Sequence, residues 1–541
     1  MLSAILWGVC LRILQAALQA SPFIFTGLCI TGLLHRLMGQ QHTRRLFGSN
    51  SIASLFQSWL IGMLLPGCSL GVIPIVKQLR RSGIAVGTIF AFALSSPLFD
   101  PLSMLYGLTL SKPITILVFA SCSLVVVTVS GSLFDWMFPN TEVVIEEPPR
   151  TPHGVKRLLA VLVVMARETV SSTAGLIVCG LLGAGLLSMV LPPSSLGRTM
   201  GHDNPYSPLL MTAIAIPAYA TPMTAMSQLG SMFQHGNSVG AAFILLIFGA
   251  GMNLGLLTWM VLNYGWKKSV VWFGLMLLIV IGFSYGIERP LFPTDIEPAD
   301  HTHAFDIYCQ PFHAGTPPTG GYPSEIWRRL RLETQPHELF GAALLAAFTS
   351  LGLFLKWLDR RWVIESWLNR CPSVATATRL KWDIVVPGPA LALVGFLTII
   401  AGSVVGCFAY YPDPAETLEE LNLAKTEALS AALGGQHEHA LHWIPICEGW
   451  NRRLQVGAYL RRGRLSDYHR MKARVFQDQL EQLEHMVEDG DPPDQIRKHV
   501  ADTSRAFGRL SAAFRDELDS PGGPAQNRGT LKTRRFLSDR L

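Results

Sequence analysis

The sequence predicts an all-α integral membrane protein. We expect about eight transmembrane helices, two re-entrant or broken helical hairpins in an inverted repeat, and a C-terminal soluble helical region. Three observations predict this fold: low charge, long apolar stretches and an internal repeat. Only 15% of the 541 residues are charged and 49% are hydrophobic, with a mean hydropathy of +0.32. A soluble chain of this length needs more charge to cover its surface.

Charge is concentrated at the C-terminal end of the chain. The segment 412–541 holds 19 of the 44 Lys and Arg residues and 20 of the 38 Asp and Glu residues. The net charge of +6 therefore belongs to loops of the membrane part, which argues against nucleic-acid binding. The nine cysteines show no paired spacing, so we expect neither a disulfide framework nor a zinc ribbon. The first apolar stretch lacks a cleavage site and reads as a span.

Eight apolar stretches are long enough to cross a bilayer, which takes about 20 residues. They cover residues 14–37, 84–108, 113–134, 167–191, 238–264, 268–287, 339–357 and 384–411. Two further stretches, 52–79 and 209–233, are interrupted by Pro66–Pro74 and Pro217–Pro222. Each half is too short to span, and irregular backbone persists at membrane depth only when protein or a cavity surrounds it. We interpret both as re-entrant hairpins; a tilted pair of kinked spans is the alternative.

Basic loops predict the orientation. Cytoplasmic loops are enriched in Lys and Arg, and the loop 357–381 carries five such residues. With this loop in the cytoplasm, the other basic loops also fall on the cytoplasmic side only if both broken stretches return to the side of the membrane from which they entered. We therefore expect a multi-pass protein of the plasma (inner) membrane, with its N-terminus and polar tail on the extracytoplasmic side.

An internal repeat relates two parts of the chain, with a constant difference of 153 in residue number. Gly83, Val86, Gly87 and Phe90 recur as Gly236, Val239, Gly240 and Phe243, and Asp100 aligns with Asn253. The predicted topology makes the two copies inverted. Inverted repeats whose broken helices meet near the midplane are typical of secondary transporters.

These features divide the chain into seven parts. We expect a first membrane repeat at 1–138, a cytoplasmic linker at 139–157, a second repeat at 158–289, an extracytoplasmic loop at 290–338, two further transmembrane helices with a basic cytoplasmic loop at 339–411, a helical soluble tail at 412–519 and disorder at 520–541. Within the tail, helical periodicity covers 418–433, 465–487 and 496–518.

The hairpin turns are candidate substrate sites. Turns between half-helices leave backbone N–H groups free for polar or anionic ligands, and we expect Ser69 to cap the second half-helix. Cys68 adds a soft ligand. The alternative is that Pro and Gly only permit the fold while Cys68 packs as an apolar residue. The candidates for substrate binding or coupling are Cys68, Ser69, Ser95, Ser96, Asp100, Tyr219, Thr221 and Asn253.

Asp100 lies in an apolar stretch, where burying a carboxylate is costly. It is therefore a candidate for proton coupling or substrate contact. Asp100-Pro101 is also a good helix start, and both roles are compatible. Asn253 at the matching position is neutral, so only the first copy can titrate.

A candidate metal site lies in the loop 290–338. His301, His303 and Cys309 place two imidazoles and a thiol close together in the sequence, a set suited to a soft or borderline metal. Such spacing also arises by chance in a loop. The histidines at 437, 439 and 442 are better explained as solvated, since only two of them share a helical face. We expect no cofactor, because the sequence contains no nucleotide-binding loop and no catalytic triad.

The stretch from Leu65 to Pro74, continued by 79–83 and 92–97, resembles the predicted permease family that includes organoarsenical efflux permeases and proposed copper/zinc efflux permeases. Residues 216–219 and 236–253 are similar to that family's second repeat. The resemblance covers about 14–290 and implies an export permease. The family usually has Cys-Ser-Cys where this chain has Cys68-Ser69-Leu70, and often a cysteine where it has Ala220. This difference argues against a strongly thiophilic substrate.

The sequence thus favours a secondary-transport permease, not an enzyme, that exports a small solute or ion of the metal, metalloid or oxyanion class. Its partners would be that solute and the lipid bilayer. The alternative is a membrane-anchored sensor or scaffold whose extracytoplasmic tail binds a protein partner. An intramembrane enzyme using Cys68 or Asp100 is disfavoured, because no base or metal set accompanies either residue. The sequence leaves the oligomeric state open.

Overall fold

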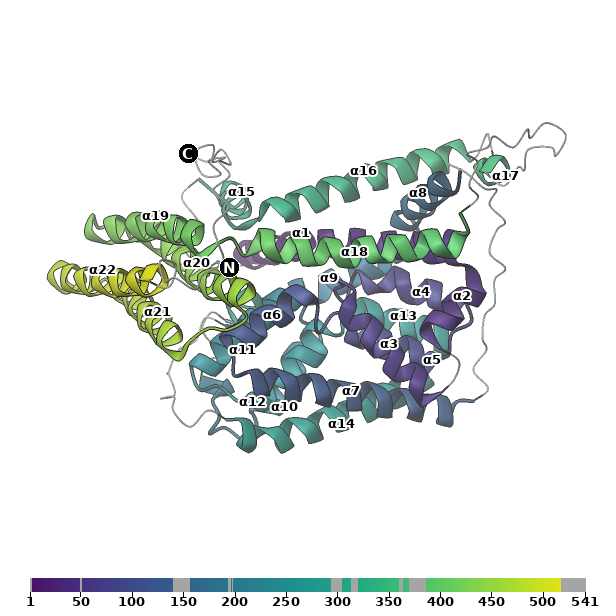
Figure 1. Ribbon diagram of the computed structural model, residues 1–541, viewed down its shortest axis with the longest axis horizontal. Helices are drawn as coiled ribbons and strands as arrows, with labels where there is room; N and C mark the ends of the chain where they lie inside the picture. The colour runs from purple at the N-terminus through teal and green to yellow at the C-terminus, as the bar shows by residue number, and fades with distance from the viewer. Residues whose placement is uncertain are drawn as a thin grey trace. The chain divides into compact units, whose positions relative to one another are not determined.

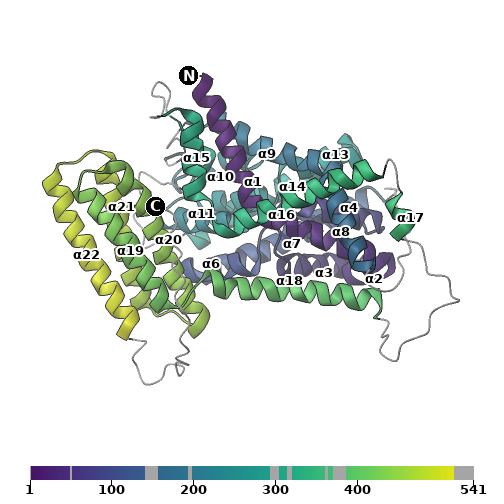
Figure 2. The same cartoon turned by 90° about the horizontal axis from the view of Figure 1, so that it is seen from above.

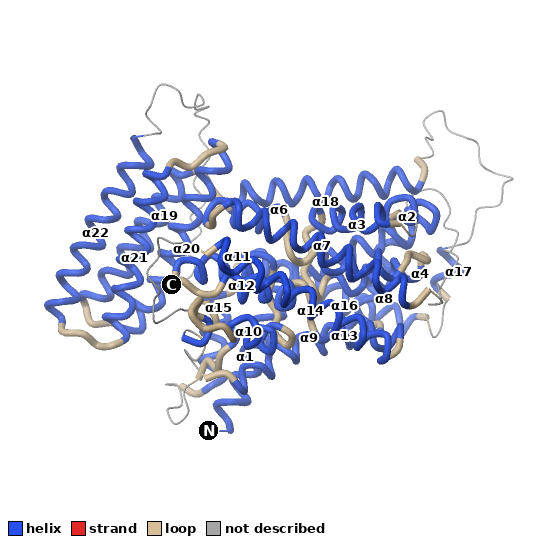
Figure 3. The backbone as a smooth tube through the Cα atoms, turned by 90° about the horizontal axis from the view of Figure 1, so that it is seen from below, coloured by secondary structure: helices blue, strands red, loops and turns tan. Residues whose placement is uncertain are grey.

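The computed structural model describes residues 2–48, 51–139, 156–192, 196, 198–292, 304–312, 320–359, 363–368 and 386–516. All regular elements in these residues are helices, drawn blue in Figure 3. The chain divides into two compact units, Met1–Cys407 and Phe408–Leu541. Most of the predicted linker 139–157 and all of the segment 520–541 lie outside the described residues.

Six helices of the described residues are long and apolar enough to cross a membrane, or seven if one bent pair counts as a span. The first combines α1 (Leu2–Leu33), a π-helical turn (Leu34–Met38) and α2 (Gly39–Phe47), and is longer than the predicted span. The others are α7 (Pro113–Met137), α9 (Ser172–Val190), α14 (Trp266–Leu291), α16 (Pro336–Leu358) and α18 (Gly388–Tyr410). The chain is therefore a multi-pass membrane protein.

The predicted span 84–108 is interrupted in the structure, where it forms two short apolar helices, α5 (Val86–Ser95) and α6 (Pro101–Leu110). The physical reason lies at the start of α6. The Asp100 carboxylate accepts the N–H of Ser103 at 2.6 Å, and Pro101 occupies the first helical position. A capping side chain followed by proline ends the preceding helix and begins a new one.

Both predicted interruptions are present. The first separates α3 (Ile52–Leu64) from α4 (Val72–Arg81), and the second separates α10 (Ser207–Ala215) from α11 (Pro222–Gln234). A further bend of 61° separates α12 (Val239–Ile244), with the π-helical turn Leu245–Ala250, from α13 (Leu254–Tyr264). Whether the first two pairs are re-entrant in a bilayer stays a prediction.

The order of elements follows the repeat. The helices α5, α6 and α7 begin at Val86, Pro101 and Pro113, and α12, α13 and α14 begin at the equivalent positions of the second copy, Val239, Leu254 and Trp266. Gly83 and its repeat partner Gly236 both have left-handed backbones, with φ of 72° and 67°. Glycine is the residue that adopts this conformation without strain. The two copies thus share local structure, while their inversion across a membrane stays a prediction.

The repeated helices also pack alike. In the first copy α5 packs against α3 and α7, and in the second copy α12 packs against α10 and α14. The two long helices α7 and α14 lie side by side (Figure 1). Figure 2 shows α1 passing across the same unit, where it packs against α9, α16 and α8 (Lys156–Thr169). Two smaller α-helices of this unit are α15 (Tyr322–Glu333) and α17 (Ile364–Leu368), and two 3₁₀ turns lie at Arg198–Met200 and Asp306–Tyr308.

The second unit contains α19 (Pro414–Leu433), α20 (His437–Arg462), α21 (Asp467–Glu488) and α22 (Pro493–Asp516). Its core includes the fully buried Phe476, Leu480 and Phe514. Three of these helices match the helical periodicity of the sequence. The helix α20 was not predicted, because Pro445 and its many polar residues hide the pattern.

Candidate functional site

Four irregular segments interrupt the apolar helices of the first unit. We name them the first break (65–71, between α3 and α4), the second break (96–100, between α5 and α6), the third break (216–221, between α10 and α11) and the fourth break (251–253, before α13). Seven of the eight predicted coupling or binding residues lie in these breaks, and Ser95 directly precedes one.

The third break touches the first break and the turn that precedes the fourth. The Tyr219 hydroxyl lies beside the Cys68 thiol, so the first and third breaks meet although they are far apart in the sequence. The backbone N–H of Ala220 donates to the carbonyl of Gly249 at 3.2 Å. This bond joins the third break to the turn that precedes the fourth.

Glycines bring the remaining pairs of breaks together. A Cβ on Gly251 would lie 2.9 Å from Leu98, which places the fourth break against the second. A Cβ on Gly67 would collide with the hydroxyl of Ser96, which places the first break against the second. With the contacts of the third break, these approaches close a ring of the four breaks. In this ring the third break reaches the fourth through the turn Leu245–Ala250 that precedes it.

Each break carries a buried polar side-chain atom without a hydrogen-bond partner among the described residues. The side chains are 0% exposed at Ser69, 1% at Ser96, 4% at Tyr219 and 0% at Asn253. The atoms concerned are Ser69 Oγ, Ser96 Oγ, Tyr219 Oη and Asn253 Nδ2. Tyr219 Oη lies beside the Cys68 thiol, a weak partner, without meeting the geometry of a hydrogen bond. An unpaired buried polar group costs about 1–3 kcal/mol, so such groups are unusual unless a ligand or water satisfies them.

The predicted cap at the first break is corrected by the structure. The cap position of α4 is Gly71, and Ser69 makes no capping bond. Instead the backbone N–H of Gly71 donates to the Cys68 sulfur at 3.3 Å. Cys68 is fully buried, so in this conformation its thiol is closed to solvent.

Two other predicted residues have structural partners. The Ser95 hydroxyl donates to the carbonyl of Phe92 at 3.2 Å. Thr221 caps α11, where its hydroxyl oxygen accepts the N–H of Thr224 at 3.2 Å. Their polar groups are occupied, so they are weaker candidates for ligand contact than the four unpaired side chains.

Asp100 and Asn253 make equivalent caps, as the repeat predicts. The Asp100 carboxylate accepts the N–H of Ser103, and the Asn253 side-chain oxygen accepts the N–H of Leu256 at 2.9 Å. Both side chains are buried. The capping role of Asp100 is confirmed, and its role in proton coupling stays a prediction.

The candidate metal ligands are only partly described. His301 and His303 lie outside the described residues. Cys309 is buried, and its backbone carbonyl accepts hydrogen bonds from the Arg12 guanidinium of α1. The metal site therefore stays a prediction.

Comparison with known proteins agrees with the membrane architecture. A family model described as a predicted permease matches residues 7–288, more than half of the chain. The chain belongs to this permease family. The matched residues contain all four breaks of the permease and both copies of the repeat, whereas the helices from α15 onward lie beyond them.

Two curated proteins are similar to the permease. The UPF0718 protein YcgR of Bacillus subtilis is 23% identical over 271 residues, which are 49% of this chain and 90% of that protein. A Streptococcus mutans protein named "Putative two-component membrane permease complex subunit" is 24% identical over 94 residues, 17% of this chain and 31% of that protein. No solved structure matches the permease.

The structure adds a pair of carboxylates that the sequence analysis missed. Asp135 accepts the N–H of Gly87 at 3.0 Å, and Glu288 accepts the N–H of Gly240 at 2.6 Å. Asp135 and Glu288 occupy equivalent positions of the two copies, as do the two glycines. The offset of the repeat was therefore the signal that could have found them.

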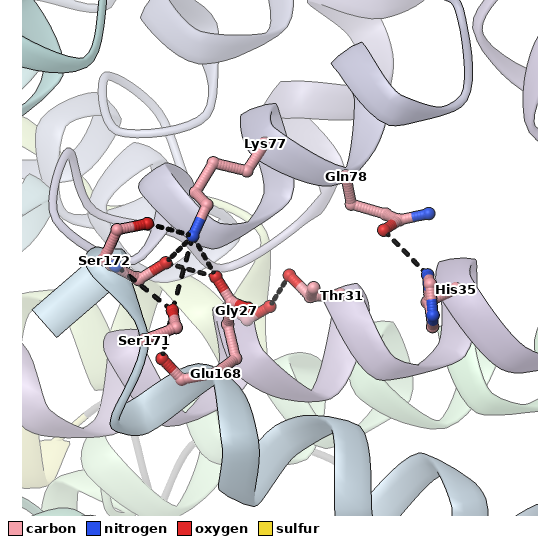
Figure 4. A network of polar contacts seen from close by, with 9 residues as sticks. Gly27, Thr31, His35, Lys77, Gln78, Glu168, Ser171 and Ser172 are labelled. Atoms are coloured by element: carbon pink, nitrogen blue, oxygen red, sulfur yellow. Dashed lines mark hydrogen bonds and ion pairs between the residues drawn. The ribbon is translucent and has the colours of Figure 1, made fainter. Parts of the chain in front are cut away.

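A second missed feature is the ion pair between Lys77 of α4 and Glu168 of α8, at 2.5 Å (Figure 4). The Lys77 ammonium also donates to the hydroxyls of Ser171, Ser172 and Thr173. This ion pair was not predicted, because nothing in the sequence marks Glu168 as the distant partner of Lys77.

Proposed function

We propose that this permease is a secondary transporter that exports a small polar solute or ion, of the metal, metalloid or oxyanion class, across the inner membrane. The substrate would bind where the four breaks meet. One observation carries the proposal: each break places a buried, unpaired polar side chain in the ring of breaks. A bound solute would supply the missing hydrogen bonds, and its departure would leave these groups to be satisfied by water.

The test removes single hydroxyls while keeping side-chain shape. Ser96→Ala and Tyr219→Phe should lower transport at least about fivefold, since each deletes a hydrogen bond that the solute makes, worth about 1 kcal/mol or more. Neither should lower thermal stability, because each removes an unpaired buried polar atom. The matched control is Ser123→Ala, whose hydroxyl donates to the carbonyl of Ala120 at 2.7 Å. That variant should lose stability and retain transport.

The solute is found first by comparing the growth of cells that lack or overproduce the permease. The panel contains divalent metals, arsenite and oxyanions. The compound whose toxicity depends on the permease is then loaded into vesicles, and its export is measured. Normal export by both Ser96→Ala and Tyr219→Phe would exclude the breaks as the substrate site.

A membrane-anchored scaffold is the second candidate, because the described tail helices form a compact unit with its own core. In that case an extracytoplasmic protein partner would bind the tail. Deletion of residues 412–541 should then abolish function, while the substitutions at the breaks should be harmless. Transport predicts the reverse.

A further inference from the structure

A cavity of about 570 Å³ lies beside α4, α9 and α13, outside the ring of breaks. The helix α4 contributes three basic residues to its lining: Lys77, Arg80 and Arg81. The other two helices contribute Ser172, Cys179 and Thr258, among others. Pockets of this size commonly hold small-molecule ligands.

The described residues that line the cavity include basic side chains and no carboxylate. Lys77 is paired with Glu168, which lies beside the cavity and not in its lining. Arg80 instead donates to the Asn263 side chain at 2.5 Å and lies over the ring of Tyr264, both uncharged groups. Its guanidinium therefore keeps an uncompensated charge, and its Nε has no partner in the described residues.

The inner end of the cavity adjoins the breaks. Cys179 and Thr258 lie together at 3.4 Å. The next residue of α9, Gly180, packs directly against the breaks, since a Cβ there would lie 2.6 Å from Leu70 and 2.9 Å from Asn253 Oδ1. Adjacent residues of α9 thus line the cavity and pack against Asn253 of the proposed substrate site.

We propose that this cavity binds the anionic group of the transported solute, an oxyanion, on the predicted cytoplasmic side of the breaks. The proposal rests on the proposed function, because it takes the breaks as the destination of the solute. Guanidinium groups recognise oxyanions through charge-assisted hydrogen bonds. A lipid phosphate has the same chemistry, but the extension of the cavity along α9 toward the breaks favours a soluble anion.

The test is binding of inorganic phosphate, sulfate and acetate to the purified full-length chain in an uncharged detergent. Calorimetry gives the Kd, and chloride at equal ionic strength is the salt control. Arg80→Gln should weaken binding about tenfold or more, since it deletes a charge-assisted contact. Glu168→Gln should tighten binding, because it removes the carboxylate beside Lys77 while the three hydroxyls still hold the ammonium.

Arg45→Gln is the matched control, because Arg45 is exposed and does not line the cavity, and its Kd should equal that of the unmodified chain. Thermal unfolding without added anion verifies that each variant is folded. If Arg80→Gln does not fold, the opposite change expected for Glu168→Gln still decides the question.

The proposal would be overturned if none of the three anions showed saturable binding, or if the Kd were unchanged in both cavity variants. It would also be overturned if phosphate binding were lost in nanodiscs containing phosphatidylglycerol, because that result would identify the cavity as a site for a lipid headgroup. The proposed function is judged separately. Ser96→Ala and Tyr219→Phe should leave the phosphate Kd unchanged, because neither residue lines the cavity. If these two substitutions abolish transport while no anion binds, the breaks remain the proposed substrate site and the cavity is excluded as an anion site.

Discussion

The helix α1 and the first break touch backbone to backbone, which makes Gly71→Ala a demanding test of the structure. A Cβ on Gly71 would lie 2.8 Å from the carbonyl carbon of Phe23, whereas ordinary contacts begin at 3.4 Å. The approach is reciprocal, since a Cβ on Gly27 would lie 2.8 Å from the carbonyl carbon of Gly71. Gly27 is visible on α1 in Figure 4.

The carbonyl oxygen of Phe23 would lie closer still, so α1 and the first break must separate by more than the 0.6 Å between 2.8 and 3.4 Å. Overpacking of this kind costs about 1–3 kcal/mol. The backbone of Gly71 has φ of −68° and ψ of −21°, which alanine adopts readily, so the whole cost is steric. Because the N–H of Gly71 donates to Cys68, the displacement also moves the first break, and we expect transport to fall with stability.

Thermal unfolding of the purified protein in detergent, followed by tryptophan fluorescence, measures the change. The control is Gly274→Ala in α14, where an added Cβ meets no atom within 4 Å. Alanine is a better helix former than glycine by about 1 kcal/mol, so this variant should be at least as stable as the unmodified chain. If Gly71→Ala unfolds at the same temperature as Gly274→Ala, the close packing of α1 on the first break is refuted.

Three further predictions concern coupling, topology and the tail. Asp100→Asn should keep the cap and the fold but stop transport driven by a proton gradient in vesicles, whereas Asp100→Ala should also lose about 1 kcal/mol of stability; normal transport by Asp100→Asn would reduce this residue to a cap. Reporter fusions at Leu541 and Arg370 should report opposite sides of the membrane, and a cytoplasmic signal at Leu541 would disprove the predicted topology. Phe476→Ala should destabilise the tail by about 3–5 kcal/mol and accelerate its proteolysis, while Val475→Ala, which is 41% exposed, should leave the proteolysis rate unchanged.

The interruptions of the helices were predictable because their chemistry is local. Proline lacks an N–H, and glycine adopts conformations closed to other residues, so Pro66–Pro74 and Pro217–Pro222 mark breaks without any tertiary information. The same reasoning predicted the helix start at Asp100-Pro101, whereas hydropathy alone counted the apolar residues on both sides as a single span. Hydropathy measures the preference for lipid and does not detect a cap that divides the segment.

The ring of contacts could not be predicted, because it joins residues that no periodicity relates. The contact of Cys68 with Tyr219 and the ion pair of Lys77 with Glu168 depend on how distant helices pack. The residue types did identify most of the candidate side chains, since a serine or asparagine within an apolar break has few structural roles. Which of them lacks a partner depends on tertiary packing, as the capped Thr221 and the unpaired Ser69 illustrate.

The equivalent caps at Asp100 and Asn253 have a consequence for the energetics of a transport cycle. In a protein whose two halves exchange roles, identical halves would give inward-open and outward-open states of equal free energy. Here one half carries an ionisable carboxyl group and the other a neutral amide in the same buried position. Solvating the first differs in free energy from solvating the second, so under the proposed transport cycle the two end states would be unequal and the empty carrier would have a preferred resting orientation. Of these two positions only Asp100 can titrate, so it would make that preference depend on pH.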